Sequence, residues 1–333
     1  MEDSKILEIG KVPETVLKRS VLKNISVIRP EVLVGSGIGE DCAALRLSDD
    51  EDIVMSCDPI TATSEDIGNL CVLVTVNDLA SAGASAIGLM ITALLPPGST
   101  ESQLADIMKD INEACKDTNV CILGGHTEIT EAVNKPLLSV TGIGKVKRGR
   151  LITTSGAKPG MDLIVTKWIG LEGSSIIAKE KEEELLSVFP KTLVDSAKKM
   201  DSMISVQKDG LIAAEHGAAA MHDVTEGGIY GALWELCEAS SVGLDADLSL
   251  IPIKQETVEI CEHYAIDPYK LISSGSMLIA TENGEGLIQK LNESGIHASI
   301  IGKTTDSKAK IVHYDGQDKY LGAPETDELY KVL

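Results

Sequence analysis

The chain has 333 residues, the length of about two domains, and 43% of them are hydrophobic, enough to bury one or two cores. Its 51 acidic and 30 basic residues give a net charge of -21, which makes nucleic acid and anionic membrane surfaces poor partners. No apolar run reaches the length of a bilayer span, no signal-peptide pattern opens the sequence, and the seven cysteines include no Cys-x-x-Cys pair. We therefore expect a globular, cytoplasmic protein with reduced cysteines and no membrane segment.

The first half of the chain predicts alternating strands and helices. Its apolar patterns predict strands at 53–60, 86–95, 120–123 and 137–146. Residues 66–84 have the pattern of a long, largely buried helix. A second helix is expected to begin at Thr100 and to end at about residue 118, because Gln103 three positions later completes a capping box.

A second series of elements follows the segment Ser155–Gly160, whose glycines and proline mark a boundary between apolar runs. Beyond this segment the patterns predict strands at 162–168, 277–281, 298–301 and 310–313. Helices are expected at 171–187, 191–204, 227–239 and 285–294. Because strands and helices alternate and no short repeat is present, we expect two α/β domains of similar size.

Several acidic residues lie at the ends of apolar strands or in glycine-rich turns instead of on charged helix faces. Asp78 is the clearest, because it follows Asn77 inside an apolar helix, where a carboxylate is costly unless it is paired or bound to a metal. Carboxylates gathered at strand ends suit Mg²⁺, and Gly227-Gly228 at a helix start offers backbone N–H groups to phosphates. Together they predict a nucleotide site. The other acidic residues of this kind are Asp41, Asp58, Glu128 and Asp223.

Most of these residues also have a purely structural interpretation. Asp58 is equally compatible with a turn, Asp223 with a helix cap, and His126 with a hydrogen-bonded turn histidine. Cys42 fits a small buried thiol, since no base is tied to it in the sequence. Gly35–Gly39 precedes a strand pattern instead of a helix, which argues against a dinucleotide-binding fold.

Six short motifs span nearly the whole chain, and their order is informative although each alone is weak. They are Gly37–Asp41, Asp58–Pro59, Val76–Ala84, Gly124–Glu128, Asp223–Gly228 and Ser274–Gly275. In this order they resemble the family of aminoimidazole ribonucleotide (AIR) synthetase, PurM. That family also contains the hydrogenase-maturation protein HypE, thiamine-monophosphate kinase and selenophosphate synthetase. The segments 66–70, 76–80 and 141–144 are most similar to the HypE branch.

The resemblance implies an α/β (α+β) protein with the two-domain PurM-like fold. Residues 1–157 would bind ATP and Mg²⁺ and contribute strands to a dimeric β-barrel, and residues 158–333 would form an α/β domain. The implied Mg²⁺ ligands are Asp41, Asp58 and Asp78. The implied nucleotide contacts are Asn77, Gly124, Gly125, Thr127, Asp223, Thr225, Gly227 and Gly228, with 124–128 as a turn beside the phosphates. His126 or Glu128 is the expected acid or base.

In function, the resemblance implies an ATP- and Mg²⁺-dependent, homodimeric enzyme that activates an oxygen of a small substrate by phosphoryl transfer. Two residues depart from HypE. HypE ends in a cysteine that accepts a carbamoyl group, whereas the last cysteine here is Cys261, and HypE has a glutamate where this chain has Ser274. The alternative is a non-catalytic, nucleotide-binding maturation partner in a hydrogenase-type assembly pathway, which would act through a protein partner.

Overall fold

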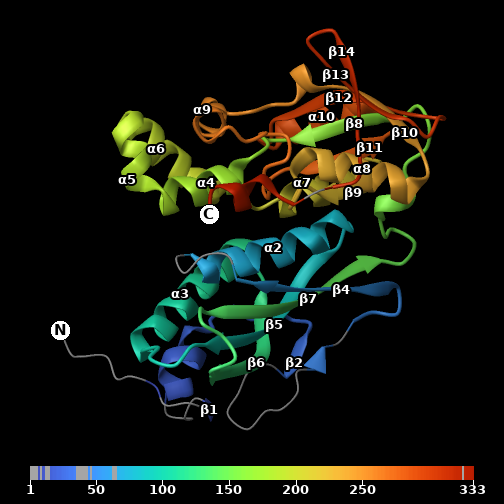
Figure 1. Ribbon diagram of the computed structural model, residues 1–333. Coiled ribbons are helices and arrows are strands. Elements are labelled where there is room, and N and C mark those ends of the chain that lie inside the picture. The colour runs from blue at the N-terminus through green and yellow to red at the C-terminus, as the bar shows by residue number, and fades with distance from the viewer. Residues whose placement is uncertain are drawn as a thin grey trace. The chain divides into compact units, whose positions relative to one another are not determined.

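The chain divides into two units, whose elements are labelled in Figure 1. The computed structural model describes residues 7, 10–11, 16–34, 44–45, 47–61, 66–324 and 326–333. Unit 1 is Met1–Leu79 with Ala84–Gly149, and unit 2 is Ala80–Gly83 with Arg150–Leu333. In the part of the chain that the structure describes, no helix has both the length and the hydropathy that crossing a bilayer requires.

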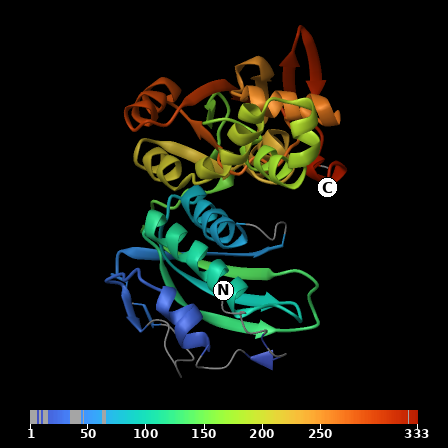
Figure 2. The same cartoon turned by 90° about the vertical axis from the view of Figure 1, so that its left-hand side faces the viewer.

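Unit 1 is a five-stranded sheet with two long helices on one face, α2 (Ile67–Ser81) and α3 (Glu101–Thr118) (Figures 1 and 2). Its strands, in spatial order, are β1 (Gly10–Lys11), β6 (Cys121–Ile129), β5 (Ser85–Leu95), β7 (Leu137–Lys147) and β4 (Glu51–Ile60). β5 and β6 run parallel because α3 crosses between them, and the other neighbours are antiparallel. The remaining elements are the helical turns η1 (Leu17–Val21) and η2 (Leu22–Asn24) and the strand pair β2 (Val32–Val34) and β3 (Ala44–Leu45).

Each strand and helix predicted for this half is present, although α2 ends at Ser81 instead of residue 84 and β6 continues to Ile129 instead of residue 123. α3 shows why its own ends were predictable. The Thr100 hydroxyl accepts a hydrogen bond from the Gln103 N–H at 3.3 Å, and the Gln103 side chain accepts one from the Thr100 N–H at 2.8 Å. The helix ends where Asn119 adopts the left-handed conformation, with φ 55°. Both ends are therefore set by local side-chain chemistry.

The glycine-rich segment Gly124–Glu128 is not a turn, and that prediction is wrong. The segment lies inside β6, where it pairs with β5 from Met90 to Leu94. Gly125 has a φ of +149°, and a Cβ atom there would lie 1.8 Å from the Ile91 carbonyl oxygen. The glycine is therefore needed for the close approach of two parallel strands.

The two faces of this sheet differ in what covers them. α2 packs directly on the backbone of β7, because a Cβ atom on Gly142 would lie 2.5 Å from the Thr75 side chain. Strand residues alternate between faces, so the even-numbered residues of β4 face α2 and the odd-numbered ones face away. On the face away from α2, Ile53 and Met55 are 60% and 62% exposed. This open face therefore carries exposed apolar side chains.

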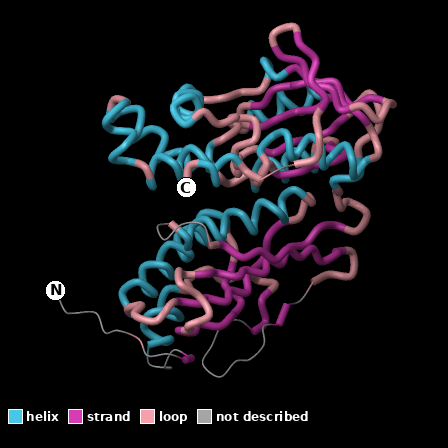
Figure 3. The backbone as a smooth tube through the Cα atoms, in the orientation of Figure 1, coloured by secondary structure: helices cyan, strands magenta, loops and turns pink. Residues whose placement is uncertain are grey.

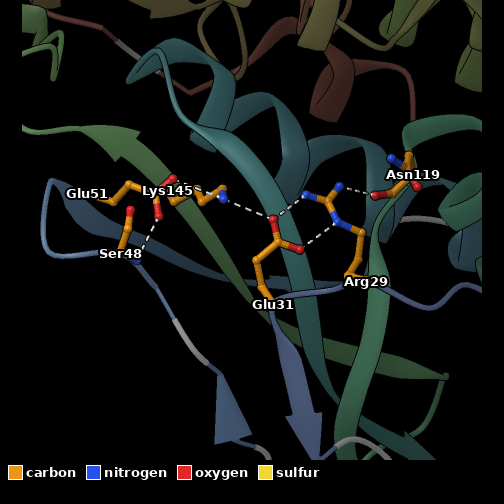
Figure 4. A network of polar contacts seen from close by, with 6 residues as sticks. All are labelled: Arg29, Glu31, Ser48, Glu51, Asn119 and Lys145. Atoms are coloured by element: carbon orange, nitrogen blue, oxygen red, sulfur yellow. Dashed lines mark hydrogen bonds and ion pairs between the residues drawn. The ribbon is translucent and has the colours of Figure 1, made fainter.

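A chain of ion pairs fixes the segment before β2 to this sheet (Figure 4). Arg29 donates two hydrogen bonds of 3.2 Å to Glu31 and one of 2.8 Å to the Asn119 carbonyl oxygen. Lys145 of β7 lies 3.0 Å from carboxylate oxygens of both Glu31 and Glu51. The Arg29 guanidinium, helped by Lys145, lowers the pKa of Glu31 to about 2. The network is therefore charged at neutral pH and connects four separate parts of the sequence.

Unit 2 is a seven-stranded sheet between two layers of helices. Its strands, in spatial order, are β14 (Gln317–Tyr320), β13 (Lys310–Tyr314), β10 (Gly243–Asp247), β12 (Ala298–Thr305), β8 (Asp162–Thr166), β11 (Met277–Thr281) and β9 (Ala218–Asp223). α8 (Gly228–Ser240) packs against the face that contains Leu163, and α7 (Gln207–Glu215) and α10 (Gly284–Glu293) pack against the face that contains Ile164. β8 and β11 are buried on both faces, which explains their continuous apolar sequences.

Four more helices of unit 2 form a separate apolar cluster, and two of them, α5 and α6, lie at one end beyond the sheet (Figure 3). They are α4 (Leu171–Glu180), α5 (Glu182–Val188), α6 (Lys191–Lys198) and α9 (Gln255–Tyr264). Short helical turns complete the unit: η3 (Thr154–Gly156), η4 (Lys199–Met203), η5 (Leu248–Leu250) and η6 (Glu328–Lys331). α4 begins soon after β8 ends, so its first turn lies near the edge of the sheet.

Candidate functional site

In unit 1, Asp58 of β4 and Asp78 of α2 converge on one hydroxyl group. The Ser56 hydroxyl donates a short hydrogen bond to Asp78 Oδ2 and lies 3.3 Å from Asp58 Oδ2. Ser56 and Asp58 are two residues apart on the strand and face α2, and Asp78 faces them from the helix. Asn77, next to Asp78, is 1% exposed. The structure therefore brings together two acidic residues that are 20 positions apart in the sequence.

These carboxylates fit part of a Mg²⁺ site. Two anionic groups that share a hydroxyl offer the hard oxygen ligands that Mg²⁺ prefers, and a cation between them would relieve their repulsion. Asp41, the third expected ligand, lies outside the described residues. Within the described residues, no group of three His, Cys, Asp or Glu side chains is arranged to hold a metal ion. The chemistry of this donor set is therefore suitable for Mg²⁺, and two of the three expected ligands lie together among the described residues.

His126 and Glu128 lie on the other face of the same sheet. Laterally paired residues of a sheet point the same way, and the register aligns Asp58 with Gly125, so His126 points away from α2. The His126 Nε2 atom lies 3.2 Å from Glu128 Oε2, and their side chains are 44% and 38% exposed. Thr127 shares the face of Asp58. The structure therefore does not bring the expected acid or base together with the carboxylate pair within unit 1.

In unit 2, three strands bring separate segments to one edge of the sheet. β8 and β9 are both antiparallel to β11, so both end where β11 begins. Asp223 is the last residue of β9 and 7% exposed. Its Oδ1 atom lies 3.7 Å from His222 Nδ1, and Oδ2 has no hydrogen-bond partner among the described residues. Burial acts to lower the pKa of His222, but Asp223 and Glu235 outweigh it and raise that pKa to about 9.

The N-terminus of α8 holds a carboxylate of the chain itself. The Gly227 N–H donates a hydrogen bond of 2.7 Å to Asp327 Oδ2. Asp327 is 3% exposed and also accepts hydrogen bonds from the N–H groups of Ile272 (3.2 Å) and Leu329 (2.8 Å). The Gly228 N–H donates to the Thr225 carbonyl oxygen at 3.1 Å. Both N–H groups expected to face a phosphate therefore have partners within the chain, and the partner of Gly227 is a carboxylate group.

Glu172, in the first turn of α4, is a buried carboxyl group in the same region. Its residue is 4% exposed, and its Oε2 atom has no hydrogen-bond partner among the described residues. Burial raises the pKa of Glu172 to about 7, and two hydrogen bonds from Ser274 limit the rise. Asp327 and Glu226 act in the same direction as burial. Sequence reasoning did not single out Glu172, His222 or Asp327.

A cavity of about 190 Å³ lies beside the start of α8. Two lysines, Lys270 and Lys319, line it, and none of its described lining residues is acidic. The Lys319 ammonium lies 5.0 Å from the centre of the Tyr230 ring. Its lining residues are Gly227, Tyr230, Gly231, Lys270, Lys319, Tyr320, Leu321, Gly322, Ala323, Pro324 and Thr326. In a chain of charge -21, the described lining of this cavity therefore has basic side chains and no acidic ones.

Comparison with known proteins identifies the family. The models for the N-terminal and C-terminal domains of AIR synthase related proteins match residues 39–146 and 158–315. The chain belongs to the AIR synthase related proteins. A hydrogenase expression/formation protein of Methanocaldococcus jannaschii is 31% identical over 317 residues, covering 91% of this chain and 90% of that protein. The carbamoyl dehydratase HypE of Cupriavidus necator is 29% identical over 285 residues, covering 82% and 79%.

Solved structures of a hydrogenase maturation protein and of a kinase have the same fold. HypE in complex with ATP aligns with a TM-score of 0.80 at 21% identity and covers 96% of each chain. A thiamine-monophosphate kinase from Stenotrophomonas maltophilia aligns with a TM-score of 0.71 at 21% identity, covering 87% of this chain and 92% of the kinase. The expected two-domain PurM-like α/β fold and the resemblance to HypE are thereby confirmed.

Proposed function

We propose that this protein is an ATP- and Mg²⁺-dependent enzyme of the HypE type that activates an oxygen atom of a small substrate by phosphoryl transfer. Two observations outside the site support this proposal. Relatives that match most of the chain are named carbamoyl dehydratases, and a HypE with the same fold binds ATP. Within the site, the proposal depends most on Asp58 and Asp78, which contact one hydroxyl as carboxylate ligands of one cation would.

The residues divide the work of phosphoryl transfer between binding and positioning. Asp58 and Asp78, with Asp41, would hold Mg²⁺, which when bound offsets the negative charge of the phosphates. In unit 2, the Gly227 N–H and Lys319 of the cavity are donors suited to an anionic group. Use of the Gly227 N–H by a phosphate requires that Asp327 release it. His126 or Glu128 remains proposed as an acid or base, although neither faces the carboxylate pair.

The first test is thermal stabilisation by ATP. A ligand that binds only the folded protein stabilises it by about 3 kcal/mol at 100 times its Kd, so Tm should rise by several degrees with ATP and Mg²⁺. With ATP and EDTA, Tm should stay near its value without ligand. The variant Asp58→Asn should lose most of the rise, whereas Asp52→Asn, on the same strand in an exposed pair with Arg148, should keep it. An equal rise with EDTA would contradict the metal-dependent site.

The environments of the cysteines favour a separate substrate molecule over a cysteine of the chain as the group that is activated. Of the described cysteines, Cys57 is exposed and the others are buried. Burial raises the pKa of Cys261 to about 12, so its thiol stays protonated and unreactive. The buried thiols are therefore poor acceptors for a group that is then activated by ATP, and Cys57 lies on the face of β4 away from Asp58. We propose that the activated oxygen belongs to a small molecule that enters the site.

We also propose a symmetric homodimer that covers the open face of the sheet in unit 1. Ile53 and Met55 expose apolar surface there, and β4 is an edge strand. Light scattering should therefore give about twice the chain mass of 35.3 kDa. Met55→Glu should give a single chain, whereas Val188→Glu, on an exposed apolar residue of unit 2, should leave the dimer intact. A wild-type protein of single-chain mass at micromolar concentration would refute the dimer.

A second candidate function is favoured by one comparison. The chain also aligns with a chain in a HypE–HypF complex, with a TM-score of 0.68 at 24% identity. The protein would then bind nucleotide in order to regulate a protein partner in maturation, without catalysis. Steady release of ADP that increases when a candidate metabolite is added distinguishes the enzyme from this alternative. Nucleotide binding without turnover, together with capture of a maturation protein, would support the alternative.

A further inference from the structure

Glu172 is a buried acid that lacks the partners a structural acid normally has. A buried carboxylate is usually paired with a cation or has all its lone pairs hydrogen-bonded, because an uncompensated buried charge is costly. Glu172 has hydrogen bonds from Ser274 and none, among the described residues, at Oε2. The titratable groups that act on it are Asp327 and Tyr330, around η6, and Glu226, before α8. Two of these are acidic and the third is a phenol, so none supplies a compensating charge.

Backbone hydrogen bonds place Glu172 among the segments that meet at the sheet edge of unit 2. The N–H of Gly173, the next residue, donates to the Ile272 carbonyl oxygen at 3.1 Å. The Ile272 N–H donates to Asp327, which also holds the Gly227 N–H. Two residues beyond Ser274, the Ser276 carbonyl oxygen accepts from the N–H of Val224, the residue after Asp223. The starts of α4 and α8 and the segment before β11 therefore form one hydrogen-bonded region.

We infer that Glu172, held by Ser274, is the proton acceptor for the substrate group that attacks the terminal phosphoryl group of ATP. This inference rests on the proposed function. In the step, the substrate O–H bond breaks and its proton moves to Oε2 of Glu172. A bond forms between the substrate oxygen and the γ-phosphorus, and the bond from the γ-phosphorus to the β–γ bridging oxygen breaks. ADP leaves with the electron pair, and Glu172 then returns the proton to solvent. With water in place of substrate, the same step gives ADP and phosphate.

The chemistry of Glu172 suits this role better than that of the other acids nearby. A base works best when its pKa is close to the working pH, and burial brings the pKa of Glu172 to about 7. Asp223 also has an unpartnered oxygen, but it lies against the cationic His222. Asp327 is held by three N–H groups. Glu172 therefore has the free oxygen and the proton affinity that a proton acceptor needs.

The test compares Glu172→Gln with wild type for ADP release from ATP and Mg²⁺ in water, between pH 5 and pH 9. The wild-type rate should increase as Glu172 ionises, with a midpoint near pH 7. Glu172→Gln should lower the rate about 10²-fold or more and remove this increase. Ser274→Ala should move the midpoint to higher pH but keep the plateau rate, because the lost hydroxyl hydrogen bond favours the ionised form, while the backbone N–H of residue 274 remains. Glu328→Gln, at a buried acid already paired with Lys331, should leave the profile unchanged.

The outcomes separate this inference from the proposed function. If Glu172→Gln retains the wild-type rate per folded molecule and the same pH midpoint, the inference about Glu172 is overturned, whereas the proposed enzymatic function is not. If wild type shows no Mg²⁺-dependent rise in Tm with ATP, or releases no ADP, the proposed function is overturned. The Tm increment with ATP and Mg²⁺, measured on each variant, checks that it is folded and binds nucleotide. If Glu172→Gln does not fold, the test is the pH midpoint of ADP release by Ser274→Ala. A midpoint equal to that of wild type would contradict the role of Glu172.

Discussion

Replacing Asp78 by asparagine should lower ATP turnover with Mg²⁺ by about 10²–10³-fold, the usual effect of removing one preorganised electrostatic partner. Asparagine keeps the shape of the side chain and can still hydrogen-bond to Ser56, but it removes one negative charge from the carboxylate pair. The free energy of unfolding without metal should change little or increase, because two repelling carboxylates become one. Turnover and Tm should be measured on the same preparation.

The matched control for Asp78→Asn is Asp52→Asn. Asp52 is also an acid beside this sheet and lies on the same face of β4 as Asp58, but it is 45% exposed and pairs with Arg148. Its substitution should leave turnover near the wild-type value, since exposed ion pairs contribute little. If Asp78→Asn instead lowers Tm and keeps normal turnover per folded molecule, Asp78 is a structural residue and the metal assignment is wrong.

Replacing Gly228 by alanine should destabilise unit 2 strongly. Gly228 has a φ of +60°, which costs an alanine about 1–2 kcal/mol. A Cβ atom there would also lie 2.6 Å from the Tyr269 carbonyl oxygen and 2.8 Å from the Leu271 carbonyl oxygen. Because these are backbone atoms, they cannot move aside as a side chain does, and the overlap should add about 1–3 kcal/mol. The measurement is the free energy of unfolding in urea.

Gly217→Ala separates the two costs in the Gly228 prediction, which are the positive φ and the overlap of the added Cβ atom with backbone oxygens. Gly217 also has a positive φ, +96°, but a Cβ atom there would meet nothing within 4 Å. This variant should therefore lose only the conformational part of the free energy. Equal stability of the two variants would mean that the start of α8 can shift to accept a methyl group, and the tight fit inferred at Gly228 would be refuted.

The parts of the fold that depend on neighbouring residues could be predicted from the sequence. The capping box at Thr100 and the strand ended by Ile60 are set within a few positions of the chain. In unit 2, α7, β9, β10 and α9 were not predicted, because their sequences are short and mix polar with apolar residues. Gly124–Glu128 was misassigned because consecutive glycines are typical of turns, and only the pairing with β5 explains them.

The candidate site also has parts that could be predicted from the sequence and parts that could not. Asp58 and Asp78 could be selected from the sequence, because a strand end and an apolar helix are unusual places for a carboxylate. Their shared contact with Ser56 could not be predicted from the sequence, because it depends on how α2 crosses β4. Glu172 carried a similar signal, an acid in an apolar segment after a strand, but its burial and its contact with Ser274 arise from tertiary packing. Asp327 had no local signal, since its partner Gly227 is 100 positions away.

The 100 positions between Gly227 and Asp327 affect the order in which unit 2 can fold during synthesis. During translation, β8, β9, α8 and β11 are synthesised long before Asp327, so the N–H groups of Gly227 and Ile272 have no carboxylate to hold them. A nascent chain with every central strand of the sheet would still have an unsatisfied start of α8. Stop codons or frameshifts upstream of residue 327 would leave the same gap permanently. For this unit, the start of α8 is among the last parts of the fold to become complete as the chain is synthesised.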